Sequence, residues 1–215
     1  MDQEKLENIR TDYSASALSE SNTKADPIKQ FEVWFNEAEK ANVPEFNAMT
    51  LATATHDGRP SARIVLLKGI YPEGFVFYTN YLSRKGKEIA KNPVCALTFF
   101  WPLMERQVRI EGTLEKITKE QSEKYFHSRP KNSQIGATVS PQSQEIDSRD
   151  ILEKKWNELS AEYADKEVPK PSFWGGYIVK PRMVEFWQGR SSRLHDRILY
   201  KKIDAKTWKK VRLAP

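Results

Sequence analysis

Apolar and polar positions along the chain predict an irregular start, a strand-rich first half, a helical middle and a strand-rich end. Apolar residues recur at helical spacing after Asp26-Pro27, a pair typical of a helix start, and Pro44 lies beyond the expected helix end. Short apolar runs separated by turn residues then predict strands at 48–55, 61–67, 75–79, 94–101 and 107–116, with a short helix at 83–91.

The helical middle is followed by a second group of predicted strands. Thr118 and Gln121 form a capping-box pattern for a helix to residue 128, and a longer helix is expected at 148–164. Because further strands are expected at both sides of these helices, the pattern favours one antiparallel barrel or sandwich. Residues 1–25 lack periodicity, so we expect a mobile arm at 1–25 and a single domain at 26–215. The later strands are expected at 176–179, 183–187, 194–203 and 208–213.

Composition places the chain among globular proteins. Of its 215 residues 39% are hydrophobic and 11% aromatic, enough for a core, which argues against disorder. No apolar run approaches the roughly 20 residues of a membrane span, and the start has no signal-peptide pattern. The one cysteine, Cys95, lies in an apolar run and is expected to be buried. One thiol cannot form an internal disulfide, which fits a cytoplasmic location.

The net charge of +6 raises the question of a nucleic-acid partner. However, 35 basic residues are offset by 29 acidic ones spread through the chain, and no nucleic-acid motif is present. The three histidines have no metal-ligand spacing. We therefore expect no nucleic acid, membrane or metal as partner, and a positive field that steers phosphorylated small molecules.

The segment from Arg193 to Arg197 is the strongest single indication of chemistry. In an extended strand Arg193, His195 and Arg197 share one face, and two guanidiniums beside an imidazole predict a site for a small anion. An edge strand with solvated charges explains these five residues equally well.

A second candidate lies where a strand ends and a helix begins near Ser83. Free N–H groups at the helix start favour phosphate, and Thr79, Arg84 and Lys85 add donors there. Cations at this end oppose the helix dipole unless an anion is bound, so a phosphate site is favoured over a solvated helix end.

Three further patterns are weaker. Taken alone, each is explained by a purely structural role as well as, or better than, by a functional one. The strand 63–68 has a cation near each end, Gln107 can both donate to and accept from a heterocycle, and Tyr125 and Arg129 lie four apart on a helix. The surplus of anion donors without a nucleophile or metal indicates an organic cofactor.

Taken in order, the motifs resemble those of the pyridoxamine 5′-phosphate oxidase family from Arg10 to Pro215: RIVLLK, FYTN, SRKG, ERQVRIEG, QIGA, SPQS, PSFWGGY, EFWQGR, RLHDR and RLAP. The resemblance implies a mainly β fold with peripheral helices (α+β), the FMN-binding split β-barrel. It implies an FMN-dependent oxidase that converts pyridoxamine 5′-phosphate and pyridoxine 5′-phosphate to pyridoxal 5′-phosphate while O2 is reduced to H2O2. It also implies a homodimer with FMN at the interface.

The resemblance assigns roles to residues by motif. Arg193 and His195 would be catalytic and orient the substrate. The implied FMN contacts are Arg63, Ile64, Val65, Leu66, Leu67, Lys68, Tyr78, Thr79, Arg84, Lys85, Gln107, Gln142, Ser143, Trp187 and Arg197. The implied substrate contacts are Arg10, Tyr13, Lys68, Tyr125, Arg129, Ser133, Arg193, Leu194 and His195.

Two other functions remain open at this point. Another split-barrel flavoprotein could use the same FMN donors, but it should lack RLHDR and the set Tyr125, Arg129 and Ser133. A carrier of flavin or pyridoxal phosphate without catalytic activity is the second. Production of peroxide from pyridoxamine 5′-phosphate in air separates a carrier from an oxidase.

Overall fold

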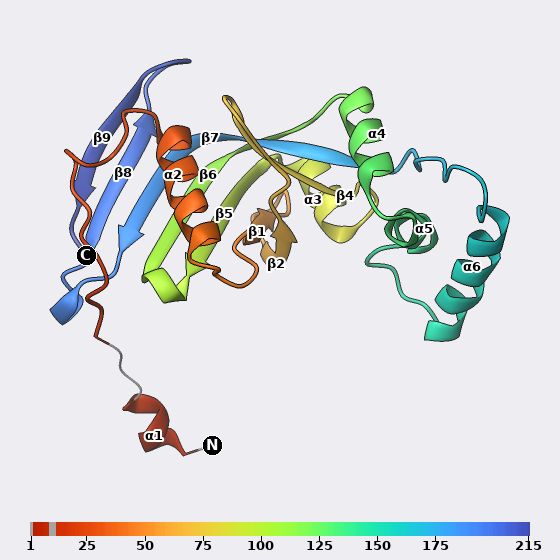
Figure 1. Ribbon diagram of the computed structural model, residues 1–215, viewed down its shortest axis with the longest axis horizontal. Coiled ribbons are helices and arrows are strands. Elements are labelled where there is room, and N and C mark those ends of the chain that lie inside the picture. Colours follow the sequence, from red (N-terminus) through yellow and green to blue (C-terminus); the bar gives the residue numbers. More distant parts are fainter. Residues whose placement is uncertain (1, 9–11) are drawn as a thin grey trace. The chain divides into compact units, whose positions relative to one another are not determined.

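The computed structural model describes residues 2–8 and 12–215 (Figure 1), which fall into two compact units. The first unit combines residues up to Met49 with Leu97–Glu111 and Pro181–Pro215. The second combines Thr50–Ala96 with Gly112–Lys180. The prediction of a mobile arm followed by a single domain stays a prediction. Among the described residues no helix is both long and apolar enough to cross a membrane.

Antiparallel strands form most of the regular structure. The strands are β1 (Ala48–Ala54), β2 (Pro60–Leu66), β3 (Gly69–Tyr71), β4 (Gly74–Asn80), β5 (Val94–Trp101), β6 (Arg106–Lys116), β7 (Trp174–Gln188), β8 (Asp196–Lys202) and β9 (Trp208–Leu213). They pair in the order β2-β1-β5-β6-β7-β4-β3, and β8 pairs with β7 and β9. The helices are α1 (Gln3–Glu7), α2 (Pro27–Lys40), α3 (Arg84–Lys91), α4 (Lys119–Ser128), α5 (Lys131–Val139) and α6 (Arg149–Glu162), with 3-10 turns η1 (Pro102–Met104) and η2 (Ser191–Arg193).

In the first unit, helix α2 packs against strands β5 to β7 (Figure 1). The Asp26 side chain accepts hydrogen bonds from the backbone N–H groups of Ile28 and Lys29, which caps the helix as the sequence predicts. Phe31 then lies 4.9 Å from Phe99 between ring centroids and is fully buried, so the apolar face of α2 forms part of the core.

In the second unit, β4 pairs with β3 and with residues 174–179 of β7. Ser83 caps α3 by accepting from the Gly86 N–H, and Thr118 and Gln121 form the predicted capping box of α4. Phe126, Ile135, Val168 and Trp174 make a buried cluster under the helices. These elements fix the strand end and helix start at which Thr79 and Lys85 lie.

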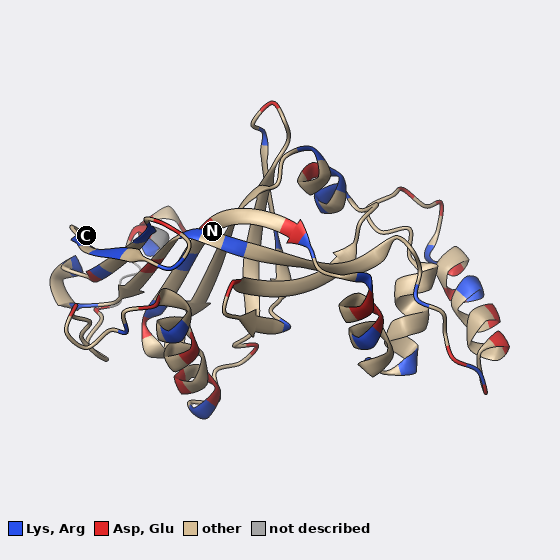
Figure 2. Cartoon of the chain, turned by 90° about the horizontal axis from the view of Figure 1, so that it is seen from above, with Lys and Arg blue, Asp and Glu red and all other residues tan. Residues whose placement is uncertain are grey.

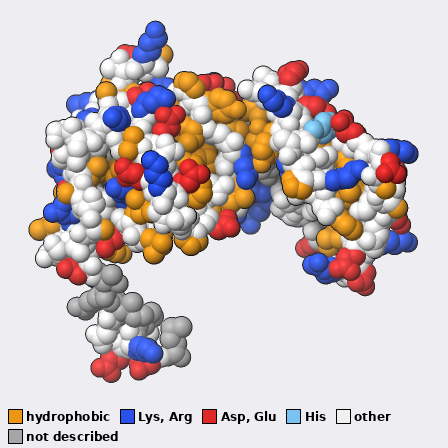
Figure 3. All heavy atoms as spheres, in the orientation of Figure 1, with side chains coloured by type: hydrophobic (Ala, Val, Ile, Leu, Met, Phe, Trp, Pro, Cys, Tyr) orange, Lys and Arg blue, Asp and Glu red, His pale blue; other side chains and the backbone are white. Residues whose placement is uncertain are grey.

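Charged and apolar side chains are distributed differently over the surface. Figure 2 shows acidic and basic residues interspersed along the helices. Figure 3 shows hydrophobic side chains exposed over the strands, and in the second unit Ile64 and Val94 are 64% and 57% exposed. A contiguous patch of exposed apolar side chains is typical of a surface that another chain or a ligand covers.

Several elements differ from the sequence prediction. Helix α1, strand β3 and helix α5 are absent from it; Pro130 takes the N-cap position of α5, where its missing N–H costs no helical hydrogen bond. The strands expected at 176–179 and 183–187 form one strand, β7, because Pro181 lies between its register with β4 and its register with β8.

Candidate functional site

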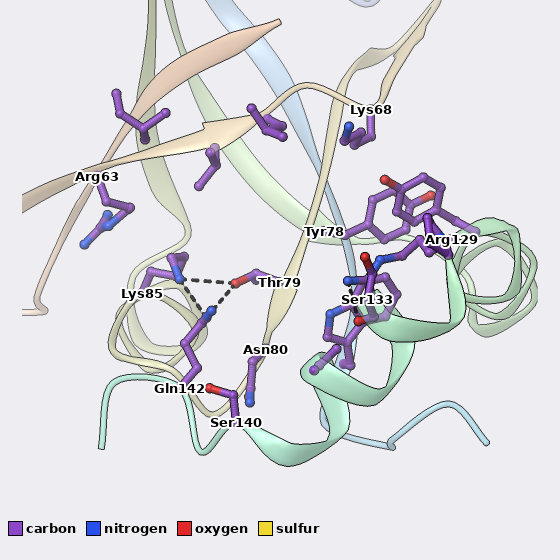
Figure 4. A pocket seen from close by; sticks show the side chains of 18 residues that line it. Arg63, Lys68, Tyr78, Thr79, Asn80, Lys85, Arg129, Ser133, Ser140 and Gln142 are labelled. Atoms are coloured by element: carbon purple, nitrogen blue, oxygen red, sulfur yellow. Dashed lines mark hydrogen bonds between the residues drawn. The ribbon is translucent and has the colours of Figure 1, made fainter. Parts of the chain in front are cut away.

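A cavity of about 570 Å³ in the second unit brings together residues from β2, β4, α4 and α5, together with Lys85 and Gln142 (Figure 4). Side chains of β2 alternate between its two faces, since Arg63 and Val65 are half-buried while Ile64 and Leu66 are exposed. Twelve of the predicted cofactor and substrate contacts line the cavity: Arg63, Ile64, Val65, Leu66, Lys68, Tyr78, Thr79, Lys85, Tyr125, Arg129, Ser133 and Gln142.

At one end of the cavity a lysine is held by neutral groups. Lys85 Nζ lies 2.9 Å from Gln142 Oε1 and 3.3 Å from Thr79 Oγ1 (Figure 4). Burial and, after it, the nearby Arg63 guanidinium lower the pKa of Lys85. A bound anion would compensate both effects, so this end of the cavity suits a phosphate.

The other end is built from stacked aromatic rings and an arginine. Tyr78 and Tyr125 stack with their centroids 3.8 Å apart, and the Arg129 guanidinium lies 4.8 Å from the Trp174 ring centroid. Arg129 Nη2 donates to the Ser133 carbonyl at 2.8 Å, whereas Nη1 is buried without a hydrogen-bond partner in the described structure. Burial lowers the pKa of Arg129 and raises that of Tyr78 to about 12. The unpartnered guanidinium nitrogen is a donor for which a water or a ligand oxygen could supply the acceptor.

Figure 4 separates these two groups within one cavity. The cluster of Lys85, Thr79 and Gln142 lies at one side, and Lys68, Arg129 and Ser133 lie at the other. Strand β2 and its apolar residues line the space near Arg63 and Lys68. Such an arrangement can hold a flat molecule that carries a phosphate at one end and a second phosphorylated molecule beside it.

Three predicted FMN contacts lie elsewhere in the same unit. Arg84 and Ser143 line a neighbouring cavity of about 560 Å³ together with His56, Lys87 and Lys91. Leu67 is buried in the core, 4% exposed, and is not among the residues that line either cavity. The N–H of Arg84 Nε donates to Glu88 Oε1 at 2.9 Å.

Glu88 is a residue that sequence reasoning missed. Its side chain is 6% exposed and contacts both Arg63 and Arg84. Its position four residues after Arg84 on a helix is a signal for an ion pair, but the same spacing occurs in many solvated pairs. Only the tertiary contacts with β1 and β2 distinguish this carboxylate.

Three of the predicted cofactor and substrate contacts, all with aromatic or imidazole rings, lie in the first unit. Trp187 and His195 lie 4.7 Å apart between ring centroids, and Tyr13 lies 5.8 Å from each. A Cβ at Gly189 would come within 2.8 Å of Tyr13, so glycine permits this approach. His195 Nδ1 accepts the Arg190 N–H at 3.1 Å, which leaves Nε2 of the neutral ring as the donor. Gln107 is half-buried on β6.

The expectation that Arg193, His195 and Arg197 share a strand face is wrong. Strand β8 begins only at Asp196, and Arg193 belongs to the 3-10 turn η2 with φ of 60°, outside extended geometry. Arg193 and Leu194 are exposed, and Leu194 is 70% exposed. Arg10 lies outside the described residues.

Arg197 is already paired. Its Nε and Nη2 groups donate to the two oxygens of the buried Glu185 carboxylate at 2.9 and 3.1 Å, and Nη1 donates to the Ala214 carbonyl. The hydrogen bond with Glu185 raises the pKa of Arg197. The bidentate geometry fixes the guanidinium and neutralises much of its charge.

Comparison with known proteins agrees with this geometry. Residues 35–162 match the family model described as pyridoxamine 5′-phosphate oxidase, and residues 174–215 match the pyridoxine 5′-phosphate oxidase C-terminal dimerisation region. The pyridoxine/pyridoxamine 5′-phosphate oxidase of Leptospira interrogans is 54% identical over 211 residues, which cover 98% of this chain and 99% of that protein. That of Salinibacter ruber is 55% identical over 213 residues, with the same coverage.

Solved structures show the same architecture. PhzG from Burkholderia lata, solved with tetrahydrophenazine-1-carboxylic acid, has a TM-score of 0.88 and 31% identity, and the match covers 94% of this chain and 100% of that one. A pyridoxamine 5′-phosphate oxidase-related, FMN-binding protein from Nostoc punctiforme has a TM-score of 0.72 at 17% identity, covering 90% and 100%. The latter likeness concerns the fold alone.

Fold and cavity together define a flavoprotein of the FMN-binding split-barrel class, which confirms the predicted mainly β fold with peripheral helices. The chain belongs to the pyridoxamine 5′-phosphate oxidase family. It is an FMN-dependent oxidoreductase, and the match to the dimerisation region confirms the predicted homodimer. The cation-lined cavity with its unpartnered Arg129 nitrogen fits a phosphate-bearing cofactor and substrate.

Proposed function

We propose that the protein oxidises pyridoxamine 5′-phosphate and pyridoxine 5′-phosphate to pyridoxal 5′-phosphate while O2 is reduced to H2O2. The observation that carries this proposal is one cavity with two separate groups of anion donors, around Lys85 and around Arg129. When bound, FMN supplies the acceptor for the hydride that leaves the substrate and passes the electrons to O2. The names of the relatives support the same reaction.

The Lys85 group is assigned to the FMN phosphate. Lys85, Thr79 and Gln142 already lie within hydrogen-bond distance of one another, so a phosphate of about −1.5 to −2 charge would meet preorganised donors. The proposal keeps Arg84 and Ser143 as FMN contacts from the neighbouring cavity.

The Arg129 group is assigned to the substrate phosphate. Arg129 offers Nη1, which lacks an acceptor in the described structure, and Lys68, Tyr125 and Ser133 line the same cavity. Holding the phosphate at this end fixes the substrate ring relative to the rest of the cavity, and binding energy far from the reacting carbon then serves orientation.

Arg193 and His195 are assigned to orienting the substrate over the flavin. His195 presents Nε2–H because Nδ1 accepts the Arg190 N–H, so the neutral ring donates a hydrogen bond. The proposal places FMN at the homodimer interface, where Gln107, Trp187 and Arg197 would complete its site. Strand β2 supports this, since it lines the cavity and also exposes Ile64 and Leu66.

The visible spectrum of the purified protein, followed by anaerobic addition of pyridoxamine 5′-phosphate, tests the reaction. An oxidase shows the flavin absorption, loses it on addition of substrate, and in air forms one H2O2 per pyridoxal 5′-phosphate. A flavin band that does not bleach would indicate a carrier, and bleaching by a different substrate alone would indicate another split-barrel flavoprotein.

Arg193→Ala tests the orienting role separately. We expect kcat/KM for pyridoxamine 5′-phosphate to fall about 100-fold, the size of effect that misplaced substrates produce, while FMN remains bound. Steady-state kinetics and the flavin content of the purified variant give both readouts. Loss of flavin from this variant would contradict the assignment.

We also propose a cytoplasmic location. The support is the single cysteine, Cys95, which is a free, buried thiol and has no disulfide role.

A further inference from the structure

We propose that Glu88 is a positioning residue for the FMN phosphate, because its buried carboxylate holds Arg63 at the edge of the main cavity and Arg84 at the neighbouring one. The inference rests on the proposed FMN site and names a residue that does not itself line the main cavity. Glu88, Arg63 and Arg84 all lie within the second unit.

The Glu88 carboxylate is surrounded by donors from three elements. Its Oε2 accepts from Thr53 Oγ1 of β1 at 2.5 Å and from Ser61 Oγ of β2 at 2.6 Å. The same oxygen lies 3.4 Å from Arg63 Nη2, and Oε1 accepts from Arg84 Nε at 2.9 Å. One carboxylate therefore ties β1, β2 and α3 together behind the cavity wall.

Arg63 determines which groups donate and which accept in these hydrogen bonds. Arg63 Nη1 donates to Thr53 Oγ1 at 2.6 Å and Nη2 donates to Ser61 Oγ at 2.5 Å, and a guanidinium can only donate. Each hydroxyl accepts from Arg63 and so turns its own proton toward Glu88. Both hydroxyls then need an acceptor for their own proton, and Glu88 Oε2 is that acceptor in each case.

The network determines where the Arg63 guanidinium is held. Nη1 also donates to the Leu51 carbonyl at 3.0 Å, and the side chain is only 20% exposed. Arg63 lines the main cavity and its charge acts on Lys85. A guanidinium fixed in this way before the ligand arrives loses little conformational freedom on binding a phosphate.

Glu88 also offsets repulsion among the cations. Burial alone would raise the pKa of Glu88, but hydrogen bonds from Ser61, Thr53 and Arg84 lower it to about 2, so it is ionised at neutral pH. Its charge opposes the effect of Arg63 on Lys85. The carboxylate thus lets several cations stand close together before a ligand anion is bound.

The test compares FMN with riboflavin, which has the same ring system and no phosphate, in titrations of the flavin-free full-length protein. Glu88→Gln keeps the side-chain size but must point an amide N–H at one of the surrounding donors. We expect its Kd for FMN to rise about tenfold, the cost of one charge-assisted hydrogen bond, with the Kd for riboflavin unchanged.

Glu153→Gln is the matched control. Arg149 Nε and Glu153 Oε1 form the same i,i+4 pair at 2.6 Å, on α6 and fully apart from the network. This variant should bind both flavins as the wild type does. Ser61→Ala is the second variant; it removes one relay hydroxyl and no charge, and its Kd for FMN should rise by a smaller factor.

The outcomes separate the two proposals. Wild-type FMN affinity in Glu88→Gln, or an equal loss for FMN and riboflavin, overturns the positioning role and leaves the proposed function intact. If Glu88→Gln does not fold, Ser61→Ala decides by the same ratio of FMN to riboflavin affinity. A wild-type protein that binds no FMN overturns the proposed function and this inference with it.

Discussion

The cations that line the cavity of the second unit and those on the strand pair β7–β8 of the first unit differ in the charge of their partners. Among the residues that line the cavity none is acidic, and Lys85 and Arg129 have neutral partners, a side-chain amide and a backbone carbonyl. On the strand pair, Arg197 meets Glu185 in a bidentate pair, and Asp196 accepts from Arg212 of the adjacent β9.

The difference separates structural cations from cations that await a ligand. A guanidinium held in a bidentate pair with a buried carboxylate, as Arg197 is, is largely neutralised within the fold, so it attracts an outside anion less than a cation with neutral partners does. Cations whose partners are neutral keep their charge available, at the cost of mutual repulsion that a bound phosphate relieves. A motif rich in arginine and lysine is therefore a stronger indication of anion binding where its cations have neutral partners.

Arg129→Ala has the largest expected effect. It tests whether a cavity cation with a neutral partner binds the substrate phosphate. We expect kcat/KM for pyridoxamine 5′-phosphate to fall several-hundred-fold, roughly 3–4 kcal/mol, because a buried charge contact with the substrate phosphate is lost. The effect should be absent with pyridoxamine, which lacks the phosphate. Arg149→Ala, an exposed arginine on α6, serves as control. Equal losses on both substrates would refute a phosphate role for Arg129.

Acid unfolding tests the lowered pKa of Glu88, whose carboxylate lies next to the cavity. Its folded pKa of about 2 lies below the ordinary 4.5, so its contribution is complete above about pH 4.5 and is lost as pH falls toward about 2. We expect the wild type to lose roughly 2 kcal/mol more than Glu88→Gln over that interval, measured by urea unfolding at each pH. Parallel stability curves for the two proteins would contradict the low pKa.

Glu185→Gln tests the paired side of the comparison. Arg197 would lose a charge-assisted hydrogen bond with the carboxylate, so we expect the free energy of unfolding to fall by about 1.5–2 kcal/mol. Glu111→Gln is the control, since the pair of Glu111 with Arg109 is exposed and should change stability by less than about 1 kcal/mol. Similar losses in the two variants would remove the distinction.

Lys85→Ala has the smallest expected effect. It tests directly whether a cation of the cavity serves FMN binding or the stability of the fold. The Kd for FMN should rise about tenfold, the cost of one charge-assisted contact. The flavin-free variant should unfold at the same or a higher temperature than the wild type, because repulsion with Arg63 is relieved. Unchanged FMN affinity, or a clear loss of stability without flavin, would place Lys85 among the structural cations.

The sequence predicts those structural features that depend on residues only a few positions apart. The helix starts at Asp26, Ser83 and Thr118 follow from side chains that cap N–H groups two or three residues later. The alternation in β2 follows from the pleat. The strand expected over 194–203 began late, because a turn with positive φ at Ser192 and Arg193 carries no strong signal in those residue types.

The sequence by itself determined the capped helices, the strand-rich halves and which segments carry anion donors, since each depends on neighbours along the chain. Tertiary structure decided which donors meet a carboxylate and which remain available. Glu88 reaches Thr53 and Ser61 from 35 and 27 positions away, and Lys85 of α3 lines one cavity with Arg129, which directly follows α4. Charge compensation depends on distance in space, and spacing along the chain does not encode that distance.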